Sequence, residues 1–287
     1  MSSAAFDYTR PASLDEALKA LSNGAGSKVI AGGQSLLPLL KLRLASVDRL
    51  VDIGRLAELK GVKTVRDGRL AVGALTTYAE LMDSPARHYG LLKDALPTIG
   101  DVQVRNRGTV GGAIAHADPA SDLPACLLAL DAEVVVRSSK GERTIPITEF
   151  FKDSFQTAIA EDELLTEVRL PGPRDDAGSA YASLEQPASG YAIVGVAVVV
   201  ARPSAGAPIA FSTVAITGVG PVAYRASTVE SALTGTDGSA AAIAAAAAHA
   251  TDGVTVNSDI HADREYRTEM ARVFTIRAIE AALARLG

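Results

Sequence analysis

Two diglycine segments are the clearest candidates for chemistry in this sequence. The first is Ala31-Gly32-Gly33-Gln34-Ser35, which directly follows a short apolar stretch, and the second is Thr109-Val110-Gly111-Gly112-Ala113. Glycine has no Cβ, so its backbone reaches left-handed conformations and can approach a ligand closely. Successive backbone N–H groups in such turns bind anions, and the hydroxyls of Ser35 and Thr109 could donate further hydrogen bonds to phosphate oxygens. The pair therefore indicates a diphosphate site, although each segment alone is also typical of a tight turn.

Other motifs narrow the type of site. Neither segment has the Gly-Lys-Ser/Thr ending of a Walker A loop or the G-x-G-x-x-G spacing of a Rossmann dinucleotide site. Asp122 could accept a hydrogen bond from a sugar hydroxyl or a ring N–H, but Asp118 and Asp122 could equally cap a helix over residues 123–130. The sequence contains no nucleophile elbow, no H-E-x-x-H and no carboxylate pair with a clear acid–base logic. We therefore assign no catalytic residue and no metal ligand, and expect a chain that holds a phosphate-bearing cofactor.

Composition excludes several classes of protein. The 287 residues include 28 Lys and Arg against 33 Asp and Glu, so the net charge of −5 argues against a nucleic-acid or anionic-membrane partner. The single cysteine, Cys126, lies in an apolar stretch and is expected to be a buried thiol; one cysteine cannot hold an iron–sulfur cluster or a Cys-rich zinc site. No apolar stretch reaches the ~20 residues that a membrane span needs, and residues 1–10 do not resemble a signal peptide, so we expect a cytoplasmic protein.

Three blocks must position these residues. The first, over residues 1–55, is a small α/β unit: a helix over 11–21, with a capping box from Ser13 to Glu16, and strands over 28–31 and 50–53. The second, over 56–175, combines four short strands with two helices. The strands are expected over 61–65, 70–72, 133–137 and 164–170, and the helices over 77–83 and 91–99. A hairpin turn is expected at Asp67-Gly68, and the proline- and glycine-containing stretch 171–179 is the clearest boundary.

The third block, over 176–287, begins with long apolar strands. Residues 192–200 and 211–218 are expected to pair antiparallel, and the alanine-rich stretch 239–250 to form a helix. A terminal amphipathic helix is predicted over 263–286 from apolar residues at helical spacing: Tyr266, Met270, Val273, Phe274, Ile276, Ile279 and Leu283.

Four strings, in chain order, carry a family resemblance: KVIAGGQSLLPLLKLRLA, VRNRGTVGGAIAHADPASDLP, DELLTEVRLP and GYAIVGVA. Together they resemble the FAD-binding medium subunit of the molybdenum hydroxylases, such as carbon monoxide dehydrogenase, with the flavin domain of xanthine dehydrogenase as a relative. The resemblance covers essentially the whole chain. It implies an α+β architecture: a two-subdomain FAD-binding fold of the vanillyl-alcohol oxidase and para-cresol methylhydroxylase type, followed by a C-terminal domain with a three-stranded antiparallel sheet and helices.

The resemblance also implies a set of residues that bind FAD non-covalently. These are Val29, Ile30, Ala31, Gly32, Gly33, Gln34, Ser35 and Leu36 in the first loop; Thr109, Val110, Gly111, Gly112 and Ala113 in the second; Asp122; backbone near Ile99 and at Leu164 or Leu165; and Tyr191 against the isoalloxazine ring. Three positions depart from the family pattern. Where this chain has Gln34, many relatives have His; where it has Ala113, they have Asn, Ser or Asp; and where it has Ser183, they have Lys. The change at Ala113 puts a polar contact to the cofactor in question, and the change at Ser183 a cationic contact to the flavin.

The implied role is that of an oxidoreductase subunit in a heterotrimer. In such enzymes a large molybdopterin subunit hydroxylates the substrate, and electrons pass through two-iron two-sulfur clusters of a small subunit to FAD and then to an external acceptor. The family further implies a dimer of heterotrimers. Two alternatives stay open: a self-sufficient flavin oxidase of the same fold, and a non-catalytic assembly subunit, which Ala113 and Ser183 would favour. The substrate would be selected on another chain, and the acceptor is not specified by this sequence.

Overall fold

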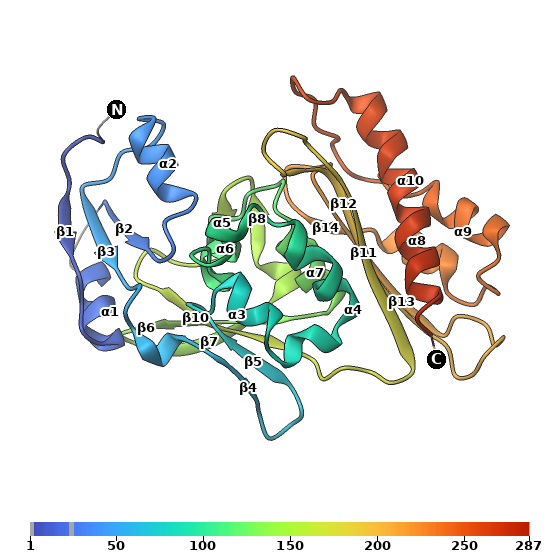
Figure 1. The fold of residues 1–287 in the computed structure, drawn as a ribbon, viewed down its shortest axis with the longest axis horizontal. Coiled ribbons are helices and arrows are strands. Elements are labelled where there is room, and N and C mark those ends of the chain that lie inside the picture. Colours follow the sequence, from blue (N-terminus) through green and yellow to red (C-terminus); the bar gives the residue numbers. More distant parts are fainter. Residues whose placement is uncertain (1–2, 23–25, 287) are drawn as a thin grey trace.

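Three β-sheets follow one another along the longest axis of the molecule in the order of the chain, as Figure 1 shows. The structure is a computed structural model that describes residues 3–22 and 26–286. The N-terminal end lies at one extremity with the first sheet, and the C-terminal helices lie at the other (Figure 1). Within the described ranges, no helix is long and apolar enough to cross a membrane.

The first sheet has three parallel strands in the order β1-β3-β2, and it carries the first glycine loop at one strand end. Its elements are β1 (Asp7–Thr9), α1 (Leu14–Ser22), β2 (Ser27–Ile30), α2 (Leu36–Lys41) and β3 (Arg49–Asp52). The predicted capping box is confirmed in part. Ser13 Oγ accepts from the Glu16 N–H at 3.3 Å, but the Glu16 carboxylate accepts from the Ala12 N–H at 2.7 Å. Strand β1 was not expected, since its three residues lack an apolar pattern.

The second sheet is five-stranded and antiparallel in the order β4-β5-β10-β6-β7. Its strands are β4 (Val62–Thr64), β5 (Leu70–Gly73), β6 (Glu133–Ser138), β7 (Gly141–Pro146) and β10 (Leu164–Leu170). The predicted turn joins β4 to β5, with Gly68 at a φ of +81°. Its connections hold α3 (Tyr78–Met82), α4 (Gly90–Ala95), α5 (Val102–Arg105), α6 (Val110–His116), α7 (Asp122–Ala129) and the hairpin β8 (Phe151–Asp153) and β9 (Gln156–Thr157). Strand β7 was missed because Ile145 is its single buried residue.

The third sheet has the order β11-β12-β13-β14, and its three long strands match the expected antiparallel sheet. The strands are β11 (Ala177–Glu185), β12 (Ala192–Ala201), β13 (Phe211–Thr217) and the two-residue β14 (Tyr224–Arg225). Helices α8 (Ser227–Leu233), α9 (Ala240–Ala247) and α10 (Arg264–Leu283) follow. Helix α7 packs on β12 and β13, whereas α10 packs on β11 and β12 from the outer side (Figure 1). Every residue of β12 is buried because both faces of this sheet are covered.

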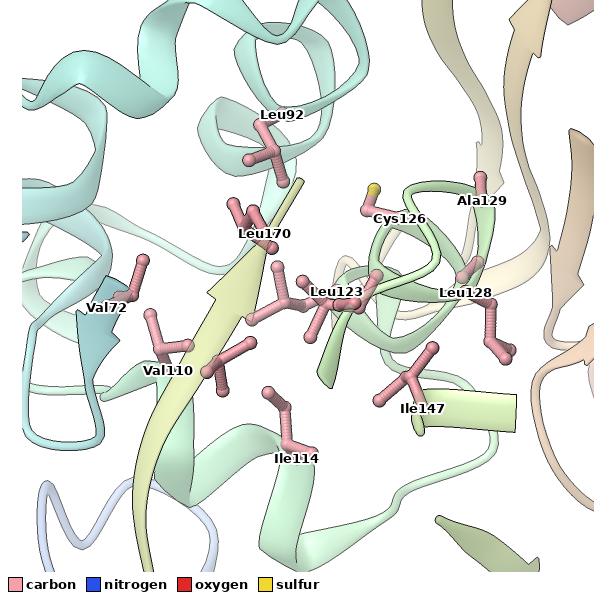
Figure 2. Packing of buried hydrophobic residues seen from close by; sticks show 14 of the residues in the cluster. Val72, Leu92, Val110, Ile114, Leu123, Cys126, Leu128, Ala129, Ile147 and Leu170 are labelled. Carbon is pink, nitrogen blue, oxygen red and sulfur yellow. The ribbon is translucent and has the colours of Figure 1, made fainter. Parts of the chain in front are cut away.

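Helix α7 is the centre of the largest core. All eight of its residues are buried, and Figure 2 shows Leu123 and Cys126 of α7 among side chains of α6 and β10. Cys126 has no exposed surface, so the expectation of a buried thiol is confirmed, and burial raises the pKa of that thiol well above its usual value. The packing of α7 against α6 and the third sheet fixes the loop between them, which carries Asp118.

The terminal helix is confirmed, but its buried face differs from the prediction. Asp263 caps α10 by accepting from the Tyr266 N–H at 2.8 Å, and Tyr266 itself remains 45% exposed. The buried residues are mostly small: Arg267, Ala271, Phe274, Thr275, Ala278, Ile279 and Ala282. These small residues let the helix backbone approach the sheet closely. A Cβ added at Gly178 in β11 would overlap the Ala282 carbonyl oxygen and lie 3.0 Å from its carbon.

We therefore expect Gly178→Ala to lower the free energy of unfolding by about 2 kcal/mol, because α10 must move away from β11. Urea denaturation of the full chain measures the change. Gly206→Ala serves as the control, since its Cβ would meet no atom within 4 Å and only the left-handed φ of +77° is strained. Equal loss in the two variants would show that helix–sheet contact is not the cause.

Candidate cofactor site

The first glycine segment lies against the backbone that leads into the second. A Cβ added at Gly32 would overlap the Arg107 carbonyl oxygen and lie 2.8 Å from its carbon and 3.1 Å from the Gly108 Cα. Gly33 has a φ of +74°, which turns the chain out of β2 into α2. The absence of a side chain at Gly32 therefore lets the first loop rest on the backbone that leads into the second segment.

The first loop presents unused hydrogen-bond donors. No group in the described part of the chain accepts from the backbone N–H of Gly33, Gln34 or Ser35. Two of the carbonyls of this loop accept hydrogen bonds: that of Gly33 from the Leu37 N–H at 3.1 Å, and that of Ser35 from the Leu39 N–H at 3.3 Å. The Gln34 amide donates to the Gly32 carbonyl at 3.3 Å. Three successive free N–H groups, half-buried or exposed, form a nest suited to an anion.

The second segment is not a loop but the first turn of α6, with Thr109 as its N-cap. Thr109 Oγ1 accepts from the Gly112 N–H at 3.1 Å, and the Ala113 N–H donates to the Thr109 carbonyl at 3.0 Å. The N–H groups of Val110 and Gly111 each donate, at 2.9 Å, to the carbonyls of Thr76 and Ala74. Among the described contacts, the Thr109 N–H is the donor of this segment left without an acceptor. The first segment therefore offers three successive backbone N–H groups and the second only that of Thr109, whereas both segments were expected to offer successive N–H groups.

Because Thr109 caps α6, we expect Thr109→Ala to lower the free energy of unfolding by about 1 kcal/mol. The Gly112 N–H then loses its acceptor, and the β-branched cap is replaced by a residue that cannot cap. Thermal unfolding of the full chain measures the change. Thr109→Ser keeps the hydroxyl and should retain nearly all the stability; a serine variant as unstable as the alanine variant would contradict the capping role.

Asp122 lies at the start of α7 and is only 4% exposed. The Tyr181 hydroxyl, from β11, donates to its Oδ1. Burial raises the pKa of Asp122 to about 6, against the opposing effect of the Tyr181 hydrogen bond. Asp122 does not cap α7: the N-cap is Ser121, which makes no side-chain hydrogen bond. Asp118 likewise accepts from the Ala120 N–H at 2.9 Å, within the preceding loop.

Tyr191 joins the first loop to this acidic region. It ends the turn between β11 and β12 and is 45% exposed. Burial raises the pKa of Tyr191, as does the negative charge of Asp118 and Asp122, whereas the nearby Ser35 hydroxyl opposes the rise. Tyr191 thus lies within reach of the first loop on one side and of Asp118 and Asp122 on the other.

The remaining predicted positions contribute backbone or distant groups. The Ile99 carbonyl accepts from the Arg105 guanidinium at 3.2 Å. Leu164 and Leu165 are each 4% exposed, so their side chains belong to the core and only their backbone could face a cofactor. Ser183 Oγ hydrogen-bonds the Glu185 carboxylate at 3.3 Å. Within the described residues, no hydrogen bond joins these four residues to the glycine segments, but Leu164 belongs to the apolar cluster that Ala31 packs against, and Leu165 shares a core cluster with Val110.

Two aromatic residues at the site were not anticipated. Tyr78 in α3 packs on Gly108, where an added Cβ would lie 2.8 Å from the Tyr78 Cε2. Burial, and after it the negative charge of Asp122, raises the pKa of Tyr78. Tyr181 reaches Asp122 across 59 residues of chain. One sequence signal could have found Tyr181: Gly195 interrupts an apolar strand, and such a glycine often marks a close approach. A Cβ at Gly195 would overlap the Tyr181 hydroxyl and lie 2.9 Å from its Cζ.

Comparison with known families covers nearly the whole chain. Residues 4–173 match the model of the FAD binding domain in molybdopterin dehydrogenase, and residues 179–282 match that of the CO dehydrogenase flavoprotein C-terminal domain. The chain is 37% identical to the carbon monoxide dehydrogenase medium chain of Hydrogenophaga pseudoflava over 283 residues, covering 98% of each chain. It is 38% identical to the glyceraldehyde dehydrogenase medium chain of Sulfolobus acidocaldarius, covering 96% of this chain and 97% of that one.

Solved structures agree in fold. The carbon monoxide dehydrogenase of Hydrogenophaga pseudoflava that lacks the Mo-pyranopterin moiety has a chain that superposes with a TM-score of 0.95 at 38% identity, covering 100% of both chains. A chain of quinoline 2-oxidoreductase from Pseudomonas putida 86 superposes with a TM-score of 0.92 at 33% identity, again over 100% of both. The overall fold of this chain is therefore shared with these proteins.

Proposed function

Because the chain belongs to the family of FAD-binding medium subunits of the molybdenum hydroxylases, we propose that it relays electrons through FAD. The electrons would come from iron–sulfur clusters of a small partner subunit and leave to an external acceptor. The observation that carries the proposal is the nest of free N–H groups at Gly33–Ser35, closed against the backbone of Arg107 and Gly108. Successive free N–H groups suit the negative charge of a diphosphate bridge.

The residues present fit a flavin dinucleotide. The N–H groups of the first loop, with the hydroxyls of Ser35 and Thr109, are donors for the diphosphate, and Asp122 is an acceptor for a hydroxyl or ring N–H. Tyr191 offers a half-exposed aromatic surface to one flavin face. FAD itself supplies the capacity to take up and release electrons, so the task of this chain is to bind, orient and shield it. Gln34, Ala113 and Ser183 replace polar or cationic groups that many relatives carry and are expected to tune affinity and potential.

The cysteine content of the chain supports the proposed division of labour between subunits. The only thiol of the sequence, Cys126, is fully buried in the core, so this chain cannot ligate an iron–sulfur cluster. This agrees with the proposal that the clusters lie on a small partner subunit and the molybdopterin on a large one. A dimer of such heterotrimers is the assembly that the family suggests.

The partner also selects the substrate in this proposal. Relatives at 37%, 38% and 32% identity are named for carbon monoxide, glyceraldehyde and caffeine, respectively. Such different substrates at similar identity imply that the medium subunit does not recognise the substrate. The surface of this chain should instead be matched to its partners and to the electron acceptor.

Co-expression with and without the two partner genes tests the proposal. The expected result is a yellow complex whose flavin is released as FAD on denaturation and is reduced when substrate is added to the complete heterotrimer. The isolated chain should bind FAD but turn over no alcohol or amine. A complex without flavin would favour an assembly subunit, and turnover by the isolated chain would favour a self-sufficient oxidase.

A further inference from the structure

A buried tyrosine holds the acidic residue of the candidate site. The Tyr181 hydroxyl donates to Asp122 Oδ1, and this bond is buried within the protein. Tyr181 is 7% exposed and Asp122 is 4% exposed. The bond uses one carboxylate oxygen and leaves Oδ2 for another donor, such as a hydroxyl of the cofactor. Tyr181 makes no hydrogen bond to the first loop or the α6 turn among the described residues, so its polar link to the site runs through Asp122.

Strand β12 is shaped around this tyrosine. Ser183 in β11 pairs with Gly195 in β12, and the Tyr181 ring lies over Gly195, where a Cβ would overlap the hydroxyl. The Tyr181 N–H is itself tied to the Asp94 carboxylate at 3.0 Å, and Asp94 is paired with Arg285 at 2.7 Å. Gly195 thus leaves the space that the Tyr181 hydroxyl occupies when it bonds Asp122.

We propose that Tyr181 is a positioning residue for FAD: it orients the Asp122 carboxylate and keeps it ionised, so that the affinity for FAD depends on pH through this pair. The proposal rests on the function proposed above and identifies how its acidic contact is controlled. Asp122 must be ionised to serve as a strong acceptor, and a hydroxyl donor favours the ionised form. The Tyr181 pKa is raised well above its usual value by burial, so the hydroxyl remains a donor throughout the useful pH range.

The surroundings of Asp122 contain no cation that could replace Tyr181, among the groups that the structure describes. The titratable groups facing Asp122 are Tyr181 and Glu185 of β11, Tyr78 of α3, Cys126 of α7 and Tyr191. Glu185 disfavours a second negative charge, and Tyr78 and Cys126 are buried neutral groups. Burial is the main reason that the Asp122 pKa reaches about 6, and the hydrogen bond from Tyr181 is the strongest effect that lowers it.

The experiment is a fluorescence titration of the full-length apoprotein with FAD between about pH 5 and pH 8. In the wild type, the dissociation constant should be constant at the alkaline end and rise up to tenfold per pH unit below about pH 6. In Tyr181→Phe, the onset of this rise should move to higher pH by about one unit. FAD binding should then be several-fold weaker near pH 6 and nearly unchanged at pH 8. A purely structural role would weaken binding equally at every pH.

Three further variants sharpen the result. Asp122→Asn should remove the pH dependence, and Gly195→Ala, which displaces the Tyr181 hydroxyl without removing it, should reproduce the shift of Tyr181→Phe. Tyr89→Phe is the matched control, because Tyr89 is also a buried tyrosine and its hydroxyl donates to the Pro171 carbonyl, away from any carboxylate. An onset unshifted in both Tyr181→Phe and Gly195→Ala overturns the positioning role while leaving FAD binding intact. Absence of FAD binding by the wild type at every pH would instead overturn the proposed function.

Discussion

Replacing Gly32 by alanine is expected to lower the affinity of the chain for FAD by about 100-fold while the three sheets remain folded. The new Cβ would overlap the Arg107 carbonyl oxygen, and that carbonyl belongs to backbone, which cannot rotate aside as a flexible side chain can. The first loop must therefore lift off the segment that leads into α6. The N–H groups of Gly33–Ser35 then no longer face the same ligand as Thr109. Flavin content after purification and FAD titration of the apoprotein measure the loss.

Gly253→Ala is the matched control for this variant. Gly253 has a left-handed φ of +74° and an added Cβ there would meet no atom within 4 Å, so its replacement costs backbone strain but closes no contact. It should keep its FAD. A Gly32→Ala protein that purifies with a full complement of tightly bound FAD would show that the close approach of the two glycine segments is not needed for the cofactor.

Asp122→Asn is expected to stabilise the apoprotein at neutral pH by about 3 kcal/mol. The ordinary pKa of 3.8 is raised to about 6 in the folded chain. Between these values the folded state holds a proton that the unfolded state has released, so this group's contribution to stability falls as pH rises from about 4 to 6 and stays low above that range. Asparagine carries no charge to bury and still accepts from the Tyr181 hydroxyl. Urea unfolding of the apoprotein at pH 4, 6 and 7.5 measures the difference, which should vanish at the acidic end.

The same substitution should weaken FAD binding, because a neutral amide is a poorer acceptor than a carboxylate. Stability would thus be gained where cofactor affinity is lost, as expected for a charge buried for function. Asp176→Asn provides the opposite case. A hydrogen bond from Arg174 lowers the Asp176 pKa, so its contribution is present at neutral pH and disappears on acidification. An Asp122→Asn protein less stable than the wild type at neutral pH would show that the carboxylate is not buried at a cost.

The elements that the sequence predicted are those with an apolar pattern. Strands β12 and β13 and helices α7 and α9 carry long apolar runs, and the structure has each of them within a few residues of its predicted range. Strands β1 and β7 were missed because both are edge strands, held by backbone hydrogen bonds to one neighbour and largely polar. An edge strand needs no apolar periodicity, so the pattern that finds central strands has nothing to detect.

The site was predicted less evenly than the fold. The proximity of the glycine segments was expected, since both were assigned to one ligand. That the second segment begins a helix was not expected, because glycine has a low helix propensity. The Thr109 cap is also hard to recognise in the sequence, because no Glu or Gln follows three residues later to complete a capping box. Tyr181 was not among the predicted site residues. Its role depends on Asp122, and no local pattern reports a hydrogen bond between a strand and a helix that begins 59 residues earlier in the chain.

The burial of α7 between the second and third sheets has a practical consequence for fragments of this protein. The two family matches end and begin on either side of residues 174–178, which suggests a convenient cut. Yet α7, which precedes the cut, is buried on every side and packs on β12 and β13, which follow the cut. A recombinant fragment that ends near residue 173 would expose the apolar side chains of α7 to water and should aggregate or bind chaperones. Crystallographic or display work on this flavoprotein is therefore best done with the undivided polypeptide.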